Sequence, residues 1–548
     1  MGEKFARLFR ATAAAIRSFL ASSRAIFTAE VRSSKFKEVL WWCLPAILAA
    51  LTLRAVLTWQ MPWGYFQFDS MDFVKTGADL ISRWKLSIPG KRSFLVPLLY
   101  SIPFLLHLPA LLLIPLAQHL LGIFQILFMG TIVRLWFVRW RIMIIPATLW
   151  LAICPWILWF EHTLMSESLT LFFLLADLCL GSLWVKTRRR EYFVWLLISL
   201  FLTAGTRGEA RFYFLFALLL LPFVVQWQWK SLRPYLLGTF GCLAVLAVIC
   251  KNNTTAPAYL FASLVDLSPD HSRFVPGFEP YIIPLRDQCR AKWLEFPADT
   301  VKVAKQVSIA ARNFLKSRHP NEEAKQIGAR IPSVLNRMSL EILLENPTTV
   351  LYYPILKTQM AIDSWVSGDF DIHYLQEKQT YALQAKRHYL APLTRGLLGK
   401  SVDQPTLDEF IKTHYHPEPV AWFGKWASTW NQTMISLRTP DTNIRQERWV
   451  HDYIAGIPEG EARMPGWPLF YPVAILGIII SIIYRHPQRI PIIAWGFTML
   501  CVWYAAQMIG NATPRYRFVY EPFLWIYVLL LLDRLSAPFS GLKKKSTQ

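Results

Sequence analysis

Cysteine is scarce in this chain of 548 residues. Seven cysteines occur, and only Cys289 lies well inside the long polar segment 251–463. Structural disulfides and Cys-based zinc sites need paired or clustered cysteines, so the sequence argues against both in that segment. The P-loop, the dinucleotide fingerprint, His-Glu-x-x-His and Gly-x-Ser-x-Gly are missing as well. An energy-coupled pump and a membrane zinc protease are therefore unsupported.

Acidic residues are few. The chain holds 36 Asp and Glu against 58 Lys and Arg, which gives a net charge of +22. The segment 251–463 is close to neutral, with 25 basic and 23 acidic residues, so the excess belongs to the apolar remainder. Basic residues gathered in loops between apolar runs indicate membrane topology and contact with anionic lipid, not nucleic-acid binding.

Long apolar runs are abundant, since 54% of the residues are hydrophobic. They predict about ten transmembrane helices, over residues 39–59, 110–132, 142–160, 164–185, 192–206, 212–227, 235–250, 467–484, 490–509 and 518–532. A span needs roughly 20 residues to cross the hydrocarbon, so the shorter runs should extend into flanking polar residues. Because Lys and Arg accumulate on the cytoplasmic side, the basic loops place both chain termini in the cytoplasm.

The predicted fold is an all-α polytopic membrane protein with a mainly helical extracytoplasmic domain inserted between spans seven and eight. The basic, Ala-rich segment 1–38 lacks the apolar core of a signal peptide and reads as an amphipathic stretch on the cytoplasmic lipid surface. Helices are expected over 299–316 and 346–366, and the Pro-containing run 94–108 is expected to be re-entrant or to lie on the outer surface. The predicted domains are 1–38, the first transmembrane module 39–250 with its outer loop 60–109, the outer domain 251–466, the second transmembrane module 467–535 and the basic tail 536–548.

Carboxylates gather in the first outer loop. Asp69 and Asp72 are three residues apart, which places them on one face of a helix. Such a pair beside the membrane can supply a general base or ligands for a divalent cation such as Mg²⁺ or Mn²⁺. The alternative is that Asp caps the helix and its neighbour is a surface acid.

The second outer loop carries Glu161, His162 and Glu167. An acid at the membrane boundary is costly without a partner, so Glu167 is a functional candidate. The alternative is a helix capped by Ser166 with Glu167 in its favourable first turn. His162 is either a proton carrier or ligand, or an ordinary wet surface histidine.

Two outer patches are cationic. Arg207 and Glu209 lie in a tight turn between two spans, and Arg515-Tyr516-Arg517 opens the last span. Arginine binds phosphate bidentately, so these patches are candidate phosphate sites at headgroup depth. An Arg207–Glu209 ion pair or a simple lipid contact is the alternative. Arg54, His119 and Asp177 fall inside spans, where ionisable groups mark functional interiors unless Arg54 extends outward or Asp177 only bonds to a neighbouring helix.

The order of these patches resembles that of the C-type integral-membrane glycosyltransferases (GT-C), particularly bacterial members similar to protein mannosyltransferases and aminoarabinose transferases. The resemblance covers roughly residues 39–235 and 465–535. The chain departs from the family pattern at Phe94, Val96 and Gly208. The residues that carry the resemblance are Asp69, Arg92 with Pro97, Gln118, Glu161, Ser166-Glu167, Thr206-Arg207-Gly208-Glu209, and Arg515-Tyr516 with Pro522.

This resemblance implies a polyprenyl-phosphate sugar donor and a lipid, glycan or protein acceptor at the outer face of a bacterial cytoplasmic (inner) membrane. It implies that Asp69 is the general base and that Glu167, with Asp72, orients the acceptor. Metal use varies in such enzymes and stays open, with Asp69, Asp72 and Glu167 as the candidate ligands. Arg92, Arg207, Arg515 and Arg517 are the expected phosphate-binding residues, and the further candidates are Glu161, His162, Gln118, Glu209 and Tyr516.

Two other functions remain open. A lipid-linked-oligosaccharide polymerase or ligase would place its key residues in the outer domain, for example Arg387, His414 and His416. A lipid or glycolipid transporter predicts inverted repeats and broken helices at the bilayer midplane. The sequence shows no internal repeat and gathers its charges near the surface, which disfavours a transporter.

Overall fold

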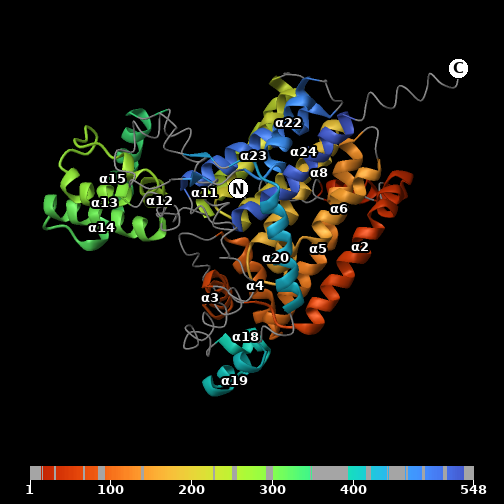
Figure 1. The fold of residues 1–548 in the computed structure, drawn as a ribbon, viewed down its shortest axis with the longest axis horizontal. Coiled ribbons are helices and arrows are strands. Elements are labelled where there is room, and N and C mark those ends of the chain that lie inside the picture. The colour runs from red at the N-terminus through yellow and green to blue at the C-terminus, as the bar shows by residue number, and fades with distance from the viewer. Residues whose placement is uncertain are drawn as a thin grey trace, which may run out of the picture.

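The structure is a computed structural model in which helices dominate (Figure 1). It describes residues 14, 17–26, 28–29, 32–65, 68–83, 93–137, 141–225, 229–249, 256–291, 300–345, 347, 393–414, 421–440, 442–443, 463–464, 467–483, 488–509 and 515–535.

Each of the ten apolar runs overlaps at least one helix. Short 3-10 turns, η1 (Arg141–Met143) and η2 (Glu209–Tyr213), precede α6 and α10. The helices are α2 (Ser34–Gln60), α5 (Ala110–Trp136), α6 (Ile144–Ile153) with α7 (Pro155–Glu161), α8 (Glu167–Thr187), α9 (Arg190–Thr206), α10 (Phe214–Val225), α11 (Trp229–Ile249), α22 (Phe470–Ile483), α23 (Arg489–Ile509) and α24 (Arg515–Leu535).

Among the described residues, four helices are long and apolar enough to cross a membrane: α2, α5, α8 and the Arg489–Ala506 part of α23. A fifth candidate is the pair α6 and α7, which are bent by 52° at their junction. The chain is thus a helical membrane protein, while the predicted number of ten spans is not confirmed. Helices such as α10 and α22, with 12 and 14 residues, are too short by themselves for the roughly 20 residues that a span needs.

The bend between α6 and α7 has a local cause. Pro155 is the first residue of α7, and proline has no backbone N–H with which to continue the hydrogen-bond ladder of α6. Cys154 before it is extended, as residues before proline usually are. The bend ends the apolar run and sends the chain into the second outer loop.

The predicted first outer loop contains two helices, α3 (Phe68–Arg83) and α4 (Leu95–Leu106). The 12 residues of α4 are too few to cross the hydrocarbon, and the helix ends at His107 in the left-handed conformation. Its buried face packs on α3 through Phe73 and Tyr100, whose ring centroids are 6.1 Å apart. The two helices therefore form one unit at the end of α2 and α5.

The main core lies around α8, which packs against α5 and α9. In its most apolar stretch 78% of the residues are buried, against 28% for α2 at the edge of the bundle. Trp136 of α5 donates to Ser182 of α8 at 3.0 Å, and Thr203 of α9 donates to Asp177 of α8 at 2.7 Å. Asp177 thus bonds to a neighbouring helix, the structural alternative that the sequence left open.

A second core belongs to residues 256–345, which Figure 1 shows beside the membrane helices. Its helices are α12 (Ala256–Ala262), α13 (Glu279–Ala291), α14 (Thr300–Arg318) and α15 (Ala324–Glu345), with the 3-10 turn η3 (Val265–Leu267). They enclose Phe261, Phe278 and Phe314. The helix predicted over 299–316 is confirmed as α14, whereas the one predicted over 346–366 falls, apart from residue 347, outside the described residues.

The described part of residues 393–440 packs against the main core and not against the second core. Their helices are α18 (Thr394–Leu398), α19 (Gln404–His414) and α20 (Ala421–Ser436), and their buried side chains, such as Leu397 and Phe423, belong to the main core. Trp156 of α7 donates to Asn431 of α20 at 3.0 Å. Two antiparallel two-residue strands, β1 (Thr442–Asn443) and β2 (Arg463–Met464), follow. The described part of the predicted outer domain therefore contains two groups with different packing partners.

The reactivity of the Cys289 thiol is a measure of how well the second core is packed. It is 4% exposed, and burial, with a smaller contribution from Asp266, raises the pKa of its thiol to about 12 from 9.0. Because the thiolate is the reactive form, this shift lowers the reactive fraction about 1000-fold near neutral pH. In a variant that keeps only this cysteine, we expect maleimide labelling of the native protein to be far slower than labelling in denaturant. Equal rates would show that α13 is not packed as described.

Candidate functional site

Backbone hydrogen bonds join the two predicted outer loops that carry the acids. Tyr65 N–H donates to the His162 carbonyl at 2.9 Å, and Leu164 N–H donates to the Tyr65 carbonyl at 2.9 Å. Asp69 follows Tyr65 by four residues, and Glu167 follows Leu164 by three. The fold therefore brings the segment that bears Asp69 close to the segment that bears Glu167, although more than 95 residues separate the two in sequence.

Glu167 is paired. Its Oε1 lies 3.2 Å from Nη1 of Arg207, and only 2% of Glu167 and 9% of Arg207 is exposed. Ser166 occupies the N-cap of α8 and Glu167 lies in its first turn, as the structural alternative predicted, but Ser166 makes no side-chain capping bond. Arg207 also donates through Nε to Glu209 Oε1 at 2.5 Å, so the ion pair that was the structural alternative for this turn is present. Arg207 thus sits between two carboxylates.

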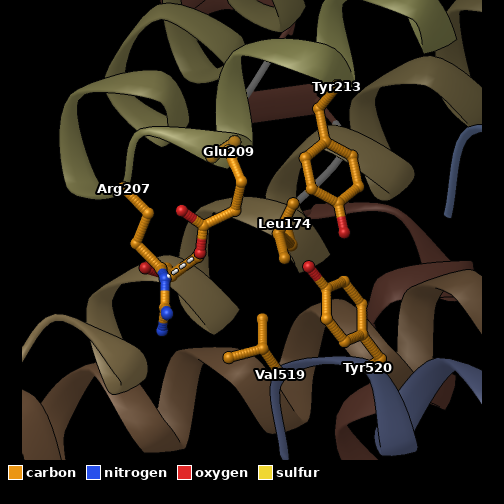
Figure 2. A pocket seen from close by; sticks show the side chains of 8 residues that line it. Leu174, Arg207, Glu209, Tyr213, Val519 and Tyr520 are labelled. Atoms are coloured by element: carbon orange, nitrogen blue, oxygen red, sulfur yellow. Dashed lines mark hydrogen bonds and ion pairs between the residues drawn. The ribbon is translucent and has the colours of Figure 1, made fainter. Parts of the chain in front are cut away.

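Arg207 and Glu209 line a pocket in which three parts of the chain meet (Figure 2). Tyr213 and Tyr520 direct their hydroxyls toward each other across it. The cavity volume is about 10 Å³, room for about one water molecule. A phosphate can enter only if side chains move, first of all the Arg207 side chain away from Glu209. The lining residues are Thr170 and Leu174 of α8, Arg207, Glu209, Ala210 and Tyr213 at the end of α9 and in η2, and Val519 and Tyr520 of α24.

The pocket reaches the beginning of α24. Val519 and Tyr520 line it, and they follow Arg515, Tyr516 and Arg517 by about one helical turn. The side chains of these three residues are outside the described set, but the start of α24 is described at Arg515. Helix N-termini carry partial positive charge from unpaired N–H groups, which favours anions.

A second cluster of charged and polar side chains lies next to the backbone hydrogen bonds that join the two loops, and the two features share His162. Arg54 Nη2 of α2 lies 2.7 Å from Glu161 Oε1, and Glu161 Oε2 lies 3.0 Å from His119 Nδ1 of α5. His119 Nε2 lies 3.0 Å from His162 Nδ1. The four residues are at most 5% exposed. We call them the buried quartet.

The buried quartet decides two alternatives that the sequence left open. Arg54 does not extend outward to water, and His162 is not a wet surface histidine, since 4% and 0% of them is exposed. The apolar runs concealed this cluster because Arg54 and Glu161 come from different helices. Burial, followed by the neighbouring His119, lowers the pKa of His162, in the connection between α7 and α8, to about 3. Its ring is therefore neutral near pH 7.

The absence of a side chain at Gly122 leaves room for the Glu161 and Arg54 side chains of the buried quartet. A Cβ at this position of α5 would lie 2.2 Å from Glu161 Oε1 and 2.8 Å from Arg54 Nη2. We expect Gly122→Ala to lower the melting temperature by several degrees, although alanine ordinarily stabilises a helix by about 1 kcal/mol over glycine. Gly241→Ala in α11 is the matched control, because nothing lies within 4 Å of its added Cβ. Equal effects of the two substitutions on thermal melting would contradict the arrangement.

Other predicted residues take structural positions around the second loop. Gln118 Nε2 of α5 donates to the Met165 carbonyl at 3.0 Å, and the Tyr100 hydroxyl of α4 donates to the same oxygen at 3.3 Å. Asp72 is half-buried on α3. Asp69 is the second residue of α3, but its side chain is outside the described set, as is the whole of Arg92.

The candidate metal site stays a prediction. Within the described ranges, no three His, Cys, Asp or Glu side chains form a group that could hold a metal ion. The predicted set contains Asp69, whose side chain is not described, so the set of Asp69, Asp72 and Glu167 is neither supported nor contradicted. For the polymerase or ligase alternative, Arg387 and His416 also fall outside the description, and exposed His414 stacks on Phe410 with ring centroids 4.4 Å apart.

Sequence reasoning missed Thr170, Tyr213 and Tyr520 as pocket residues. Thr170 donates to the Thr206 hydroxyl at 2.8 Å, beside Arg207. Tyr520 lies four residues after Tyr516, on the same helix face, so the helical period applied to the Arg515-Tyr516 motif could have indicated it. Tyr213 carries no such signal, since it lies at the start of an apolar run.

Comparisons with known proteins give little further information. No protein-family model and no curated protein matches the chain. Among solved structures, it is similar to the archaeal oligosaccharyltransferase AglB from Archaeoglobus fulgidus, in complex with an inhibitory peptide and a dolichol-phosphate, at 12% identity and a TM-score of 0.40. The alignment covers 93% of this chain and 51% of that chain, so this chain spans about half the length of AglB. At this TM-score the similarity adds no independent support for a function.

Proposed function

We propose that the chain is a membrane glycosyltransferase that transfers a sugar from a polyprenyl-phosphate donor to a lipid, glycan or protein acceptor at the extracytoplasmic face. The observation that carries the proposal is the pocket at which α8, the Arg207–Glu209 turn and the first turns of α24 meet, with Glu167 paired to Arg207 beside it. These segments are the ones that carry the sequence resemblance to GT-C enzymes. A bacterial cytoplasmic membrane, with both termini inside, is the proposed location.

The pocket can serve the phosphate of the donor. Arg207 offers a guanidinium fork at low exposure, but Glu167 and Glu209 already share its charge. The N-terminus of α24 adds partial positive charge, and Arg92, Arg515 and Arg517 are the other proposed phosphate-binding residues. Arginine and a helix N-terminus together suit a phosphate whose negative charge grows as the glycosidic bond breaks.

The proposed reaction is a displacement at the anomeric carbon. The acceptor hydroxyl or amine attacks this carbon, and the bond between the carbon and the phosphate oxygen breaks, so that polyprenyl phosphate leaves with the bonding electrons. Asp69 takes the proton from the acceptor, a step that is worth roughly 10²–10⁴-fold. Glu167 and Asp72 orient the acceptor, and if a divalent cation takes part, Asp69, Asp72 and Glu167 are its proposed ligands.

Binding of the leaving group tests the donor class without any knowledge of the sugar. The purified protein is titrated with polyprenyl phosphate and, as a matched control, with the corresponding polyprenol. We expect the phosphate form to bind at least about tenfold tighter, since a charge-assisted contact to Arg207 is worth at least 1.4 kcal/mol. Equal affinity for the two lipids would contradict a phosphate site.

A further inference from the structure

Hydrogen bonds link the buried quartet into one chain. Arg54 donates through Nη2 to Glu161 Oε1 at 2.7 Å. His119 bridges the other two members, with Nδ1 3.0 Å from Glu161 Oε2 and Nε2 3.0 Å from His162 Nδ1. The chain of contacts therefore runs from Arg54 through Glu161 and His119 to His162.

The contact with His119 holds the His162 ring in one orientation. The carbonyl of His162 also accepts from Tyr65 N–H, one of the hydrogen bonds that join the two predicted outer loops. Glu161 ends α7, and Glu167 begins α8 six residues later. The side chains of Glu161 and His162 thus fix one end of the predicted second outer loop. Gln118 and Tyr100 donate to the Met165 carbonyl near its other end.

We propose that Arg54, His119, Glu161 and His162 are positioning residues, which hold the second outer loop so that Glu167 stays opposite Arg207. None of the four lines the pocket. The inference rests on the proposed function only where it concerns catalysis, because the position of Glu167 can be measured without substrate. The space left by Gly122 supports it, since α5 is shaped to admit the Glu161 carboxylate.

The substrate-free test is a double-mutant cycle on thermal melting of the full chain. Glu167→Gln removes the ion pair with Arg207, and Glu161→Gln removes the ion pair with Arg54. We expect Glu167→Gln to lower the melting temperature clearly in the wild type and by less than half as much in the Glu161→Gln background, because a loop that Glu161 no longer holds already has a weakened Glu167–Arg207 pair. Additive shifts would overturn the proposal.

Glu341→Gln is the matched control for this cycle. Glu341 is a buried carboxylate of α15 that accepts from the Ser272 hydroxyl at 2.5 Å, in the separate second core. Its substitution should be additive with Glu167→Gln, as expected for distant sites. If Glu161→Gln does not fold, Gly122→Ala takes its place in the cycle, since it displaces the carboxylate without removing it.

The catalytic arm separates positioning from mere stability. In a transfer assay below the melting transition, we expect Glu161→Gln to lower kcat about tenfold and to leave KM for the donor within about twofold, since a misplaced group costs mainly the chemical step. An unchanged kcat would overturn a role in catalysis. If the wild type transfers no sugar but the cycle shows coupling, the proposed function fails and the positioning stands.

Discussion

Replacing Arg207 with Met should lower sugar transfer by about 10²–10³-fold, the usual loss when one preorganised donor to a developing negative charge is removed. Arg207 is the cationic side chain among the residues described as lining the pocket, and it is 9% exposed. The measurement is kcat for release of polyprenyl phosphate. Arg207→Lys keeps the charge but not the bidentate fork, so it should retain an intermediate activity.

The same substitution should also destabilise the protein. Without Arg207, Glu167 is left as a carboxylate that is 2% exposed, and breaking a buried pair from one side costs about 3–5 kcal/mol. Arg207→Met with Glu167→Gln should recover part of the lost stability and none of the lost transfer. A singly substituted Arg207→Met protein with wild-type kcat would remove Arg207 from the site.

Asp69→Asn should lower transfer by about 10²–10⁴-fold, because asparagine keeps the shape of the side chain but cannot accept the acceptor proton. Expression and thermal melting should change little, since asparagine keeps the shape of the side chain and Asp69 lies in the first turn of α3. Asp79→Asn, further along the same helix, is the matched control and should keep transfer near the wild-type rate. Retained activity in Asp69→Asn would mean that another carboxylate, first of all Asp72, is the base.

The sequence predicted well those features that depend on local pattern. Apolar runs gave the positions of the membrane helices within a few residues, for example α8 and α9, because lipid and core both select continuous apolar stretches. The Arg207–Glu209 pair was predictable because its two members are adjacent in a tight turn. The bend at Pro155 was missed, although proline is its cause, because apolar composition alone does not distinguish a straight helix from a broken one.

Contacts between distant segments were not predictable. Arg54 and Glu161 are separated by 107 positions, and nothing in either segment shows that their helix faces meet. Composition likewise made residues 251–466 appear uniform, yet 256–345 have their own core and 393–440 pack on the membrane helices. Such assignments depend on which buried faces fit together, and a single sequence does not contain that information directly.

The most direct test of a donor-consuming transferase is the release of polyprenyl phosphate by the purified protein. Wild type and Asp69→Asn are incubated with a panel of polyprenyl-phosphate sugars, with and without a divalent cation, and the freed lipid phosphate is measured. The account predicts that the wild type consumes at least one donor and that Asp69→Asn consumes none. If neither folded protein consumes a donor and the wild type binds polyprenyl phosphate no better than polyprenol, the transferase account is contradicted.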